Sequence, residues 1–168
     1  MQTISTHSYK TPYGELLLGS FNEQLCLCDW TYRKMRSTID KRIQTGLDAT
    51  YVDRPCDLLE VARRQLDEYF QQKRRQFDLP LKMIGTNFQQ SVWHALLNIP
   101  YGSTSSYLEL ANTLNKKLAV RAVASANGAN AMSIIIPCHR VIGSNGELTG
   151  YAGGLPTKKR LLQLERHE

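Results

Sequence analysis

Aspartate is missing from more than half of this chain: of its 168 residues, none after Asp78 is an aspartate. From Ser91 onward, eight lysines and arginines stand against four glutamates, and the whole chain has a formal net charge of +6. The second half therefore suits a polyanionic partner such as nucleic acid better than the first half does. A catalytic carboxylate in this half has to be one of four glutamates, Glu109, Glu147, Glu165 or Glu168.

Long apolar runs are also missing, and none approaches the roughly 20 residues that a membrane-spanning helix needs. The polar segment 1–10 does not have the pattern of a secretory signal peptide. Four cysteines in a chain without such a signal favour free thiols in a reducing cytosol. We therefore expect a cytoplasmic protein with no membrane contact, long enough for one or two domains.

A zinc site is the first use to consider for the cysteines of the first half. Cys26 and Cys28 would lie on one face of a strand, because side chains alternate with a period of two. Cys56 and His7 could complete a set of four ligands. The spacing is not that of a zinc ribbon or knuckle, so we predict no metal.

The first half has the pattern of an α/β domain. Strands are predicted at 3–9, 15–20 and 24–30, with turns between them that form a β-meander. Segment 33–46 mixes helix and loop, and 50–55 is a connection or a short strand. A helix capped by Asp57 runs to about 72, and 77–81 is a further strand. The composition changes near 80–86, which divides the chain into domains 1–82 and 83–168.

The second half is mostly helical. One helix is capped by Thr86 or Asn87, two short helices span 106–114 and 118–127, and a last one spans 158–165. Asn127-Gly128 is typical of a helix C-cap. The two short helices flank a tight turn, which is the helix-turn-helix pattern. Small residues around Arg121 suit insertion into a nucleic-acid groove, but an alanine-rich helix packed on its neighbour would have the same composition, and both interpretations stay open.

Residues 133–143 contain the most distinctive chemistry. The apolar run 133–136 predicts a buried strand, which Pro137 would end. Cys138 and His139 follow where the strand gives way to a turn. A lone buried cysteine is more often a small hydrophobic residue than a nucleophile, and these residues alone leave both roles open.

Taken together, the chain resembles the methylated-DNA–protein-cysteine methyltransferases, also called O6-alkylguanine-DNA alkyltransferases. Their Ile-Ile-Pro-Cys-His-Arg-Val hallmark is intact at 135–141. Further matches, in the same order along the chain, lie at residues 85–89, 92–93, 99–102, 106–107, 110–111, 120–123, 126–130 and 150–154. The resemblance is dense over 83–166 and loose before it.

The resemblance implies a fold and a type. The N-terminal domain would be a ribonuclease-H-like α/β domain with an antiparallel sheet. The C-terminal domain would be mostly helical and winged-helix-like, with a helix-turn-helix. The chain lacks the cysteine-rich regulatory domain of the bacterial adaptive-response fusions and resembles the stand-alone bacterial type. It also lacks the zinc ligands of the animal enzymes.

The implied function is DNA repair by a suicide enzyme without a cofactor. The protein would bind damaged double-stranded DNA in the minor groove, as a monomer, and flip the alkylated base out of the duplex. The alkyl group of O6-alkylguanine, and of O4-alkylthymine, would pass irreversibly to Cys138. Each molecule would act once, because nothing in the chain obviously reverses the thioether.

The family's roles carry over onto single residues. Cys138 is the implied nucleophile, His139 its base through a water, and Glu165 the group that orients His139. Tyr107 would donate toward the purine ring, Lys158 would lie near the leaving oxygen, and Asn130 would brace the turn around the cysteine. Ala131 departs from the proline that the family often has, which is expected to loosen that turn.

Binding roles carry over in the same way. Arg121 would fill the gap that the flipped base leaves. The other implied contacts to DNA are Tyr107, Ala122, Ser125 and Ala126. Backbone groups of Cys138, Val141 and Ala152 would read the purine edge, while Tyr151 and Gly153 line the pocket. Some relatives have serine at position 152, but a backbone contact does not depend on that difference.

Three other functions fit the sequence less well. The alkyltransferase-like damage binders have tryptophan in place of the nucleophile, which Cys138 argues against. A helix-turn-helix transcription factor would need base-reading polar side chains, and 118–127 offers little beyond Arg121. A thiol hydrolase usually has its cysteine and histidine far apart in sequence, unlike Cys138 and His139.

Overall fold

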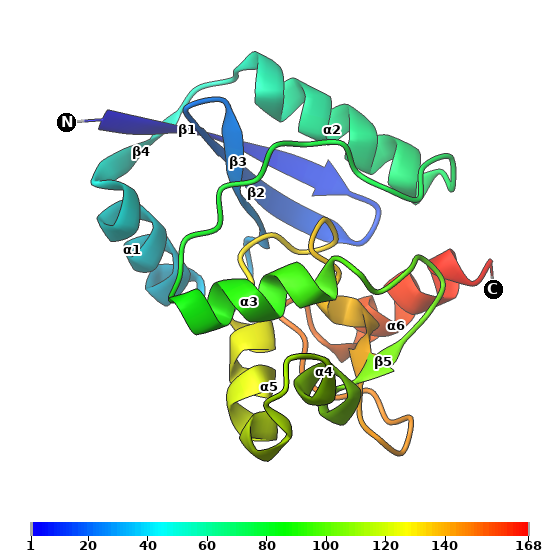
Figure 1. The fold of residues 1–168 in the computed structure, drawn as a ribbon. Coiled ribbons are helices and arrows are strands. Elements are labelled where there is room, and N and C mark those ends of the chain that lie inside the picture. The colour runs from blue at the N-terminus through cyan, green and yellow to red at the C-terminus, as the bar shows by residue number, and fades with distance from the viewer. Residues whose placement is uncertain (1, 168) are drawn as a thin grey trace. The chain divides into compact units, whose positions relative to one another are not determined.

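The computed structural model describes residues 2–167, and the chain divides into two compact units. One unit ends at Gly85 and the other begins at Thr86, whereas the composition places the boundary after residue 82. Each unit contains its own helices and strands (Figure 1). Among the described residues, no helix is both long enough and apolar enough to cross a bilayer.

The N-terminal unit is built on a four-stranded sheet in the order β3-β2-β1-β4. Its strands are β1 (Gln2–Thr11), β2 (Gly14–Phe21), β3 (Gln24–Trp30) and β4 (Ala49–Asp53). The predicted meander is confirmed, because β1, β2 and β3 pair antiparallel. β4, which the sequence left open between connection and strand, pairs parallel with β1. The sheet therefore has an antiparallel part and one parallel edge strand.

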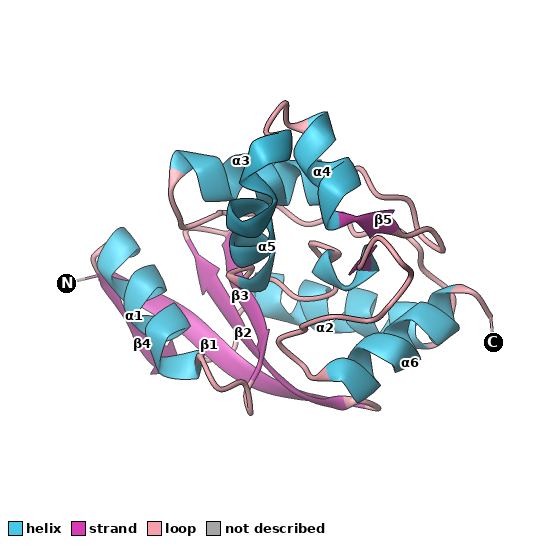
Figure 2. Cartoon of the chain, turned by 90° about the horizontal axis from the view of Figure 1, so that it is seen from below, coloured by secondary structure: helices cyan, strands magenta, loops and turns pink. Residues whose placement is uncertain are grey.

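Two helices flank this sheet, α1 (Arg36–Leu47) and α2 (Asp57–Phe70). Tyr51 on β4 donates a hydrogen bond to Asp40 of α1, and Tyr9 on β1 donates one to Asp67 of α2. Tyr51 pairs with Ile4 of β1, so their side chains lie on the same face of the sheet. Ile4 is five residues before Tyr9, which is an odd number. Because side chains alternate along a strand, the two tyrosines point to opposite faces. The helices thus cover the two faces of the sheet (Figure 2).

Two predicted details of this unit are wrong. Cys56, not Asp57, is the N-cap of α2, and its extended backbone makes no side-chain cap bond. Residues 77–81 form no strand: only Leu81 bridges to Leu25 of β3. Pro80 accepts the Leu25 N–H through its carbonyl, but it has no N–H of its own to extend the pairing.

Within its described residues, the C-terminal unit has four α-helices, α3 (Asn87–Leu96), α4 (Tyr107–Thr113), α5 (Val120–Gly128) and α6 (Leu155–Glu165). Two short strands, β5 (Ser105–Ser106) and β6 (Val141–Ile142), pair parallel. Thr86 caps α3, as one of the two predicted choices: its hydroxyl accepts from the Gln89 N–H while the Gln89 side chain accepts from the Thr86 N–H. This reciprocal box satisfies two N–H groups of the first turn.

Helices α4 and α5 follow each other across a tight turn, in which Asn115 has a left-handed backbone at φ 57°. The next residues, Lys117–Ala119, form a 3-10 turn, so α5 begins later than predicted. The predicted C-cap at Asn127-Gly128 is wrong: Gly128 is still helical, and the cap is Ala129 with a right-handed backbone. Trp93 of α3 donates its indole N–H to the carbonyl of Ala126 (2.8 Å), which joins α5 to α3.

The last helix begins earlier than predicted. α6 starts at Leu155 instead of Lys158, with Pro156 in its first turn. Proline suits this position because the first N–H groups of a helix have no intrahelical acceptor. Two residues of the candidate site, Lys158 and Glu165, are thus the fourth and the last residue of one helix.

Candidate active site

The apolar run before Cys138 is a buried turn, so the predicted strand at 133–136 is wrong. The Ile135 N–H bonds back to Ser133, and the Ile136 N–H bonds back to Met132. Ile134 has a left-handed backbone at φ 73°, which is rare for a β-branched residue. Burial explains why this segment is apolar, and the pattern alone does not distinguish a buried turn from a buried strand.

Asn130 supplies hydrogen bonds that a strand partner would otherwise give. Its side-chain amide donates to the carbonyl of Ile136 (2.9 Å), and its oxygen accepts the N–H of Met132 (3.0 Å). Asn130 is itself buried. Backbone groups in an apolar interior need partners, so this side chain holds the turn that leads into Cys138.

Cys138 opens a single 3-10 turn, Cys138–Arg140, directly after Pro137. All three residues of the turn are buried, and Cys138 has only 4% of its surface exposed. The turn puts a thiol, an imidazole and a guanidinium at three consecutive positions in the buried interior. Such surroundings strengthen every electrostatic interaction between them.

His139 forms a buried pair with Glu165 in the last turn of α6. The His139 Nε2 and Glu165 Oε2 atoms are 2.7 Å apart. Burial alone would raise the pKa of Glu165, but the hydrogen bonds and charges of His139 and Arg140 outweigh it and hold that pKa well below 4.5. An ionised carboxylate only accepts hydrogen bonds, so Nε2 carries the proton of this pair.

The other imidazole nitrogen of His139 is the acceptor. Nδ1 is buried and has no hydrogen-bond partner within residues 2–167. Burial lowers the pKa of His139 below 6.5; Glu165 opposes this shift, and the charges of Arg140 and Lys158 add to it. The imidazole is therefore neutral near pH 7, and the Nδ1 lone pair is left to accept a proton.

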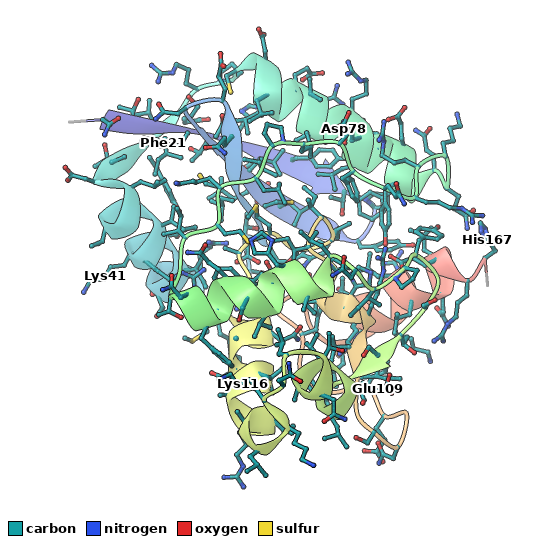
Figure 3. All side chains as sticks on the ribbon, viewed as in Figure 1. Phe21, Lys41, Asp78, Glu109, Lys116 and His167 are labelled. Atoms are coloured by element: carbon teal, nitrogen blue, oxygen red, sulfur yellow. The ribbon has the colours of Figure 1, made fainter. Side chains whose placement is uncertain are left out.

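The other three glutamates of this half do not compete for this role. Glu109 and Glu147 are exposed, and Glu109 is labelled on α4 in Figure 3. Glu168 lies outside the described residues. Only Glu165, among those described, is buried beside His139.

Arg140 joins the candidate site through its contacts, although the sequence alone suggested no separate role for it. Its Nε and Nη2 bond to the two oxygens of Glu165 (2.8 and 3.0 Å), and its Nη1 bonds to the carbonyl of Ile99 (2.7 Å). The arginine stands within the hallmark heptapeptide, and a buried guanidinium needs a partner of opposite charge. That partner could have been sought among the few glutamates of this half.

Lys158 is fully buried in α6, and its ammonium contacts backbone carbonyls. Nζ bonds to Val141 (2.6 Å) and Thr149 (2.6 Å), with a longer contact to Gly150 (3.4 Å). Burial lowers the pKa of Lys158 to about 8, while the Cys138 charge acts in the opposite direction. Lys158 thus ties the glycine-rich loop 150–154 to β6, next to the cysteine.

Tyr107 and Tyr151 approach the same loop from different elements. Tyr107, the first residue of α4, accepts a hydrogen bond at its hydroxyl from Thr149 (3.2 Å). The Tyr151 ring lies edge-on to the His139 ring, with centroids 6.4 Å apart. Ala152 is half-buried, whereas Gly153 and Val141 are buried.

The residues expected to contact DNA are only partly on one surface. Arg121, Ala122 and Ser125 are exposed on α5. Ala126 is only 3% exposed, so its side chain does not belong to that surface. Lys116 and Lys117 are exposed in the preceding turn, where Figure 3 labels Lys116. The exposed part is small, basic and free of carboxylates.

The first-half cysteines are not arranged as metal ligands. Cys26 and Cys28 are buried in β3, and burial raises the pKa of Cys26 to about 12. His7 faces Asp53 instead (3.6 Å). Among the described residues, no group of three or more histidines, cysteines or carboxylates is placed to hold a metal ion.

Two family models cover almost the whole chain. Residues 4–83 match the 6-O-methylguanine DNA methyltransferase ribonuclease-like domain, and residues 87–167 match the DNA binding domain of the same family. The first match agrees with the ribonuclease-like N-terminal domain that the sequence predicts. The second covers every residue of the candidate site.

Several relatives and solved structures extend along the full chain. A methylated-DNA–protein-cysteine methyltransferase of Methanosarcina barkeri is 46% identical over 158 residues, covering 94% of each protein. The Mycobacterium leprae protein of that name is 42% identical, over 98% of this chain and 94% of the relative. A crystal structure of Mycobacterium tuberculosis OGT in complex with DNA superimposes with a TM-score of 0.82 at 38% identity, covering 98% of this chain and 93% of that chain. By sequence and by fold, this chain belongs to the methylated-DNA–protein-cysteine methyltransferase family, whose members are enzymes.

Proposed function

We propose that this protein repairs DNA by moving the alkyl group of O6-alkylguanine onto Cys138, once per molecule and irreversibly. One observation carries the proposal beyond family membership. Cys138 directly precedes a buried, neutral imidazole, that of His139, in one 3-10 turn. Nδ1 of this imidazole bonds to no described residue, while Nε2 is held by an ionised Glu165. A base oriented by a carboxylate next to a nucleophile is the arrangement that activates cysteine for displacement.

The displacement balances within this site. The Cys138 proton passes through a water to Nδ1 of His139, and the sulfur forms a bond to the alkyl carbon as the bond from carbon to O6 breaks. The leaving guanine takes one proton from the Tyr107 hydroxyl, and the proton that His139 accepted returns through solvent to Tyr107. The product is a thioether, and no described residue is placed to return it to a thiol, so the proposed reaction is a single turnover.

Lys158 contributes by position in this scheme. The resemblance implies a place near the leaving oxygen, but its Nζ lies on the carbonyls of Val141 and Thr149. We assign it to holding the loop 150–154, which contains the pocket residues Tyr151, Ala152 and Gly153. Backbone groups of Cys138, Val141 and Ala152 remain the proposed readers of the purine edge.

DNA binding is proposed through α5. The relative of known structure that is named as a complex with DNA supports this partner. Arg121 would occupy the gap of the flipped base, and the small Ala122 and Ser125 would let the helix lie close to the minor groove. Lys116 and Lys117 are suited to contact phosphates without regard to DNA sequence.

Three further expectations stay predictions. They are that the protein acts as a monomer, that it also repairs O4-alkylthymine, and that it is located in the cytoplasm.

The test is to incubate the protein with duplex DNA that contains O6-methylguanine and to weigh its peptides. We expect one added methyl mass on the peptide with Cys138, and one lesion lost per protein molecule. Methyl on another cysteine would contradict the assigned nucleophile. Loss of many lesions per protein molecule would contradict the single turnover.

A further inference from the structure

Arg140 holds Glu165 from the side opposite to His139. Its Nε bonds to Oε1 and its Nη2 to Oε2, in the two-point geometry that suits a planar guanidinium and a carboxylate. The third bond, from Nη1 to the Ile99 carbonyl, anchors the guanidinium to the segment after α3. The guanidinium also lies 5.7 Å from the centre of the Tyr101 ring. These contacts fix the position of the Arg140 guanidinium, which in turn fixes the Glu165 carboxylate.

Glu165 is held by donors at both oxygens. Oε1 accepts from Arg140 and, at 3.4 Å, from the Gly102 N–H, whereas Oε2 accepts from Arg140 and from His139. A carboxylate bonded in this way cannot rotate about its terminal torsion. The orientation of the imidazole, and with it the direction of Nδ1, is thus set by Arg140 through Glu165.

The charge of Arg140 matters as much as its geometry. A buried carboxylate alone beside an imidazole favours the imidazolium, which cannot accept the thiol proton. The guanidinium supplies the compensating positive charge, so the imidazole can stay neutral. The charged and titratable groups around His139 are Glu165 and Lys158 on α6 and Arg140 and Cys138 in its own turn, and the Tyr151 ring is nearby.

We propose that Arg140 is the positioning residue that keeps His139 a neutral base with Nδ1 available to the Cys138 proton. The inference rests on the proposed transfer to Cys138 and deepens it. Arg140 takes no part in breaking or making bonds and does not touch the substrate. It determines the pH range over which the transfer to Cys138 proceeds.

The experiment compares Arg140→Gln, Arg140→Lys and the native protein by single-turnover transfer from free O6-benzylguanine at pH 5.5 to 9. The free base removes DNA binding from the measurement. Arg140→Gln should shift the acid limb of the profile to higher pH, with a rate loss of at least about tenfold near pH 6 that is largely recovered near pH 9. Arg140→Lys keeps the charge, so its acid limb should stay near that of the native protein while the rate falls throughout.

A matched control is Lys159→Gln, which removes one positive charge from an exposed position on α6, the helix that contains Glu165. Its profile should coincide with the native one. An equal loss at every pH in Arg140→Gln would overturn the inference and leave Arg140 a merely structural residue. Absence of any transfer by the native protein would instead refute the proposed function.

A second measurement does not depend on whether the Arg140 variants fold. Nitrogen-15 NMR of the histidines in the native protein reports which ring nitrogen carries a proton. At pH 7 we expect His139 to be neutral, with the proton on Nε2 and none on Nδ1. A proton on Nδ1, in either the other neutral form or the imidazolium, would overturn the inference.

Discussion

Both units of this protein bury a carboxylate against arginine, yet only one of these clusters is suited to catalysis. In the N-terminal unit, the fully buried Asp29 accepts from Arg33 (3.1 Å) and Arg36 (2.9 Å). Burial raises the pKa of Asp29, although both arginines oppose the shift. Arg36 continues to Asp40 of α1 (2.8 Å), so the cluster ties the helix to the end of β3.

The cluster of the C-terminal unit differs by one imidazole. Glu165 is bound by one arginine and by His139, and its pKa is lowered instead of raised. The N-terminal cluster binds its carboxylates with arginines and the Tyr51 hydroxyl. In the C-terminal cluster, Nδ1 of His139 bonds to no described residue and can accept a proton. The difference suggests that a buried ion pair can assist a reaction when one member can still accept a proton and a nucleophile follows in the chain.

Replacing one cysteine in each unit should give the largest contrast. Cys138→Ala should abolish alkyl transfer completely, because the other three cysteines all lie in the N-terminal unit. Cys28→Ala should transfer at the native rate and lose only about 1–2 kcal/mol of unfolding free energy, from the buried volume it removes. Peptide masses and urea denaturation measure the two effects. Residual methylation in Cys138→Ala would show a second acceptor.

Neutralising one carboxylate in each cluster should separate chemistry from stability. Glu165→Gln should slow transfer by a factor on the order of 10²–10⁴, because the imidazole loses its orientation. Asp29→Asn should leave the rate per folded molecule unchanged and lower the free energy of unfolding by about 3–5 kcal/mol, since its arginines stay buried and unpaired in charge. A slow but stable Asp29→Asn would mean that the first cluster also serves the reaction.

Arg121 provides a contrast between binding and chemistry within the C-terminal unit. Arg121→Ala should slow repair of O6-methylguanine in duplex DNA by about tenfold or more, because the flipped state loses the side chain that fills its gap. Reaction with free O6-benzylguanine should not change. Equal losses on the two substrates would place Arg121 in the fold of the site instead of in flipping. Single-turnover rates on both substrates measure this.

The pH dependence of stability should distinguish the clusters by sign. The pKa of His139 is lowered on folding, so the unfolded chain binds the extra proton and stability should fall as pH falls below 6.5, by at most about 1.4 kcal/mol per pH unit. Asp29, with its raised pKa, acts in the opposite direction: its contribution declines as pH rises above 3.8. Denaturation of the native protein and of His139→Gln between pH 5 and 7 measures the difference, and equal slopes would contradict the assignment.

Much of the fold follows from local patterns in the sequence. The meander, the capping box at Thr86 and the short helix after Ser106 are each encoded within a few residues, by alternation or by a side chain that caps its own helix. The hallmark heptapeptide and its companions placed Cys138 and His139 in one site. The choice of the carboxylate that orients His139 could be narrowed to four glutamates, Glu165 among them, because the second half has so few carboxylates.

The remaining features depend on contacts between distant residues. The turn at 133–136 is stabilised by the Asn130 side chain. Its apolar residues are buried as those of a strand would be, so the sequence pattern wrongly predicts a strand there. Arg140 bonds to Glu165, which is 25 positions away. Lys158 bonds to carbonyls of two other segments, Val141 in β6 and Thr149 and Gly150 in the loop after it. The alternation of apolar and polar residues in strands and the periodicity of helices are local patterns. They do not predict hydrogen bonds between residues that are far apart in the sequence.

The hydrogen bond between Trp93 and Ala126 gives this protein a built-in optical label. The chain has two tryptophans, Trp30 in the N-terminal unit and Trp93 in the C-terminal one. Indole emission responds to the loss of a hydrogen bond and to a change in surrounding polarity. With Trp30→Phe, the remaining fluorescence comes from Trp93, whose N–H is bonded to the carbonyl of Ala126 in α5. Movement of α5 relative to α3 can then be followed in real time without attaching a dye.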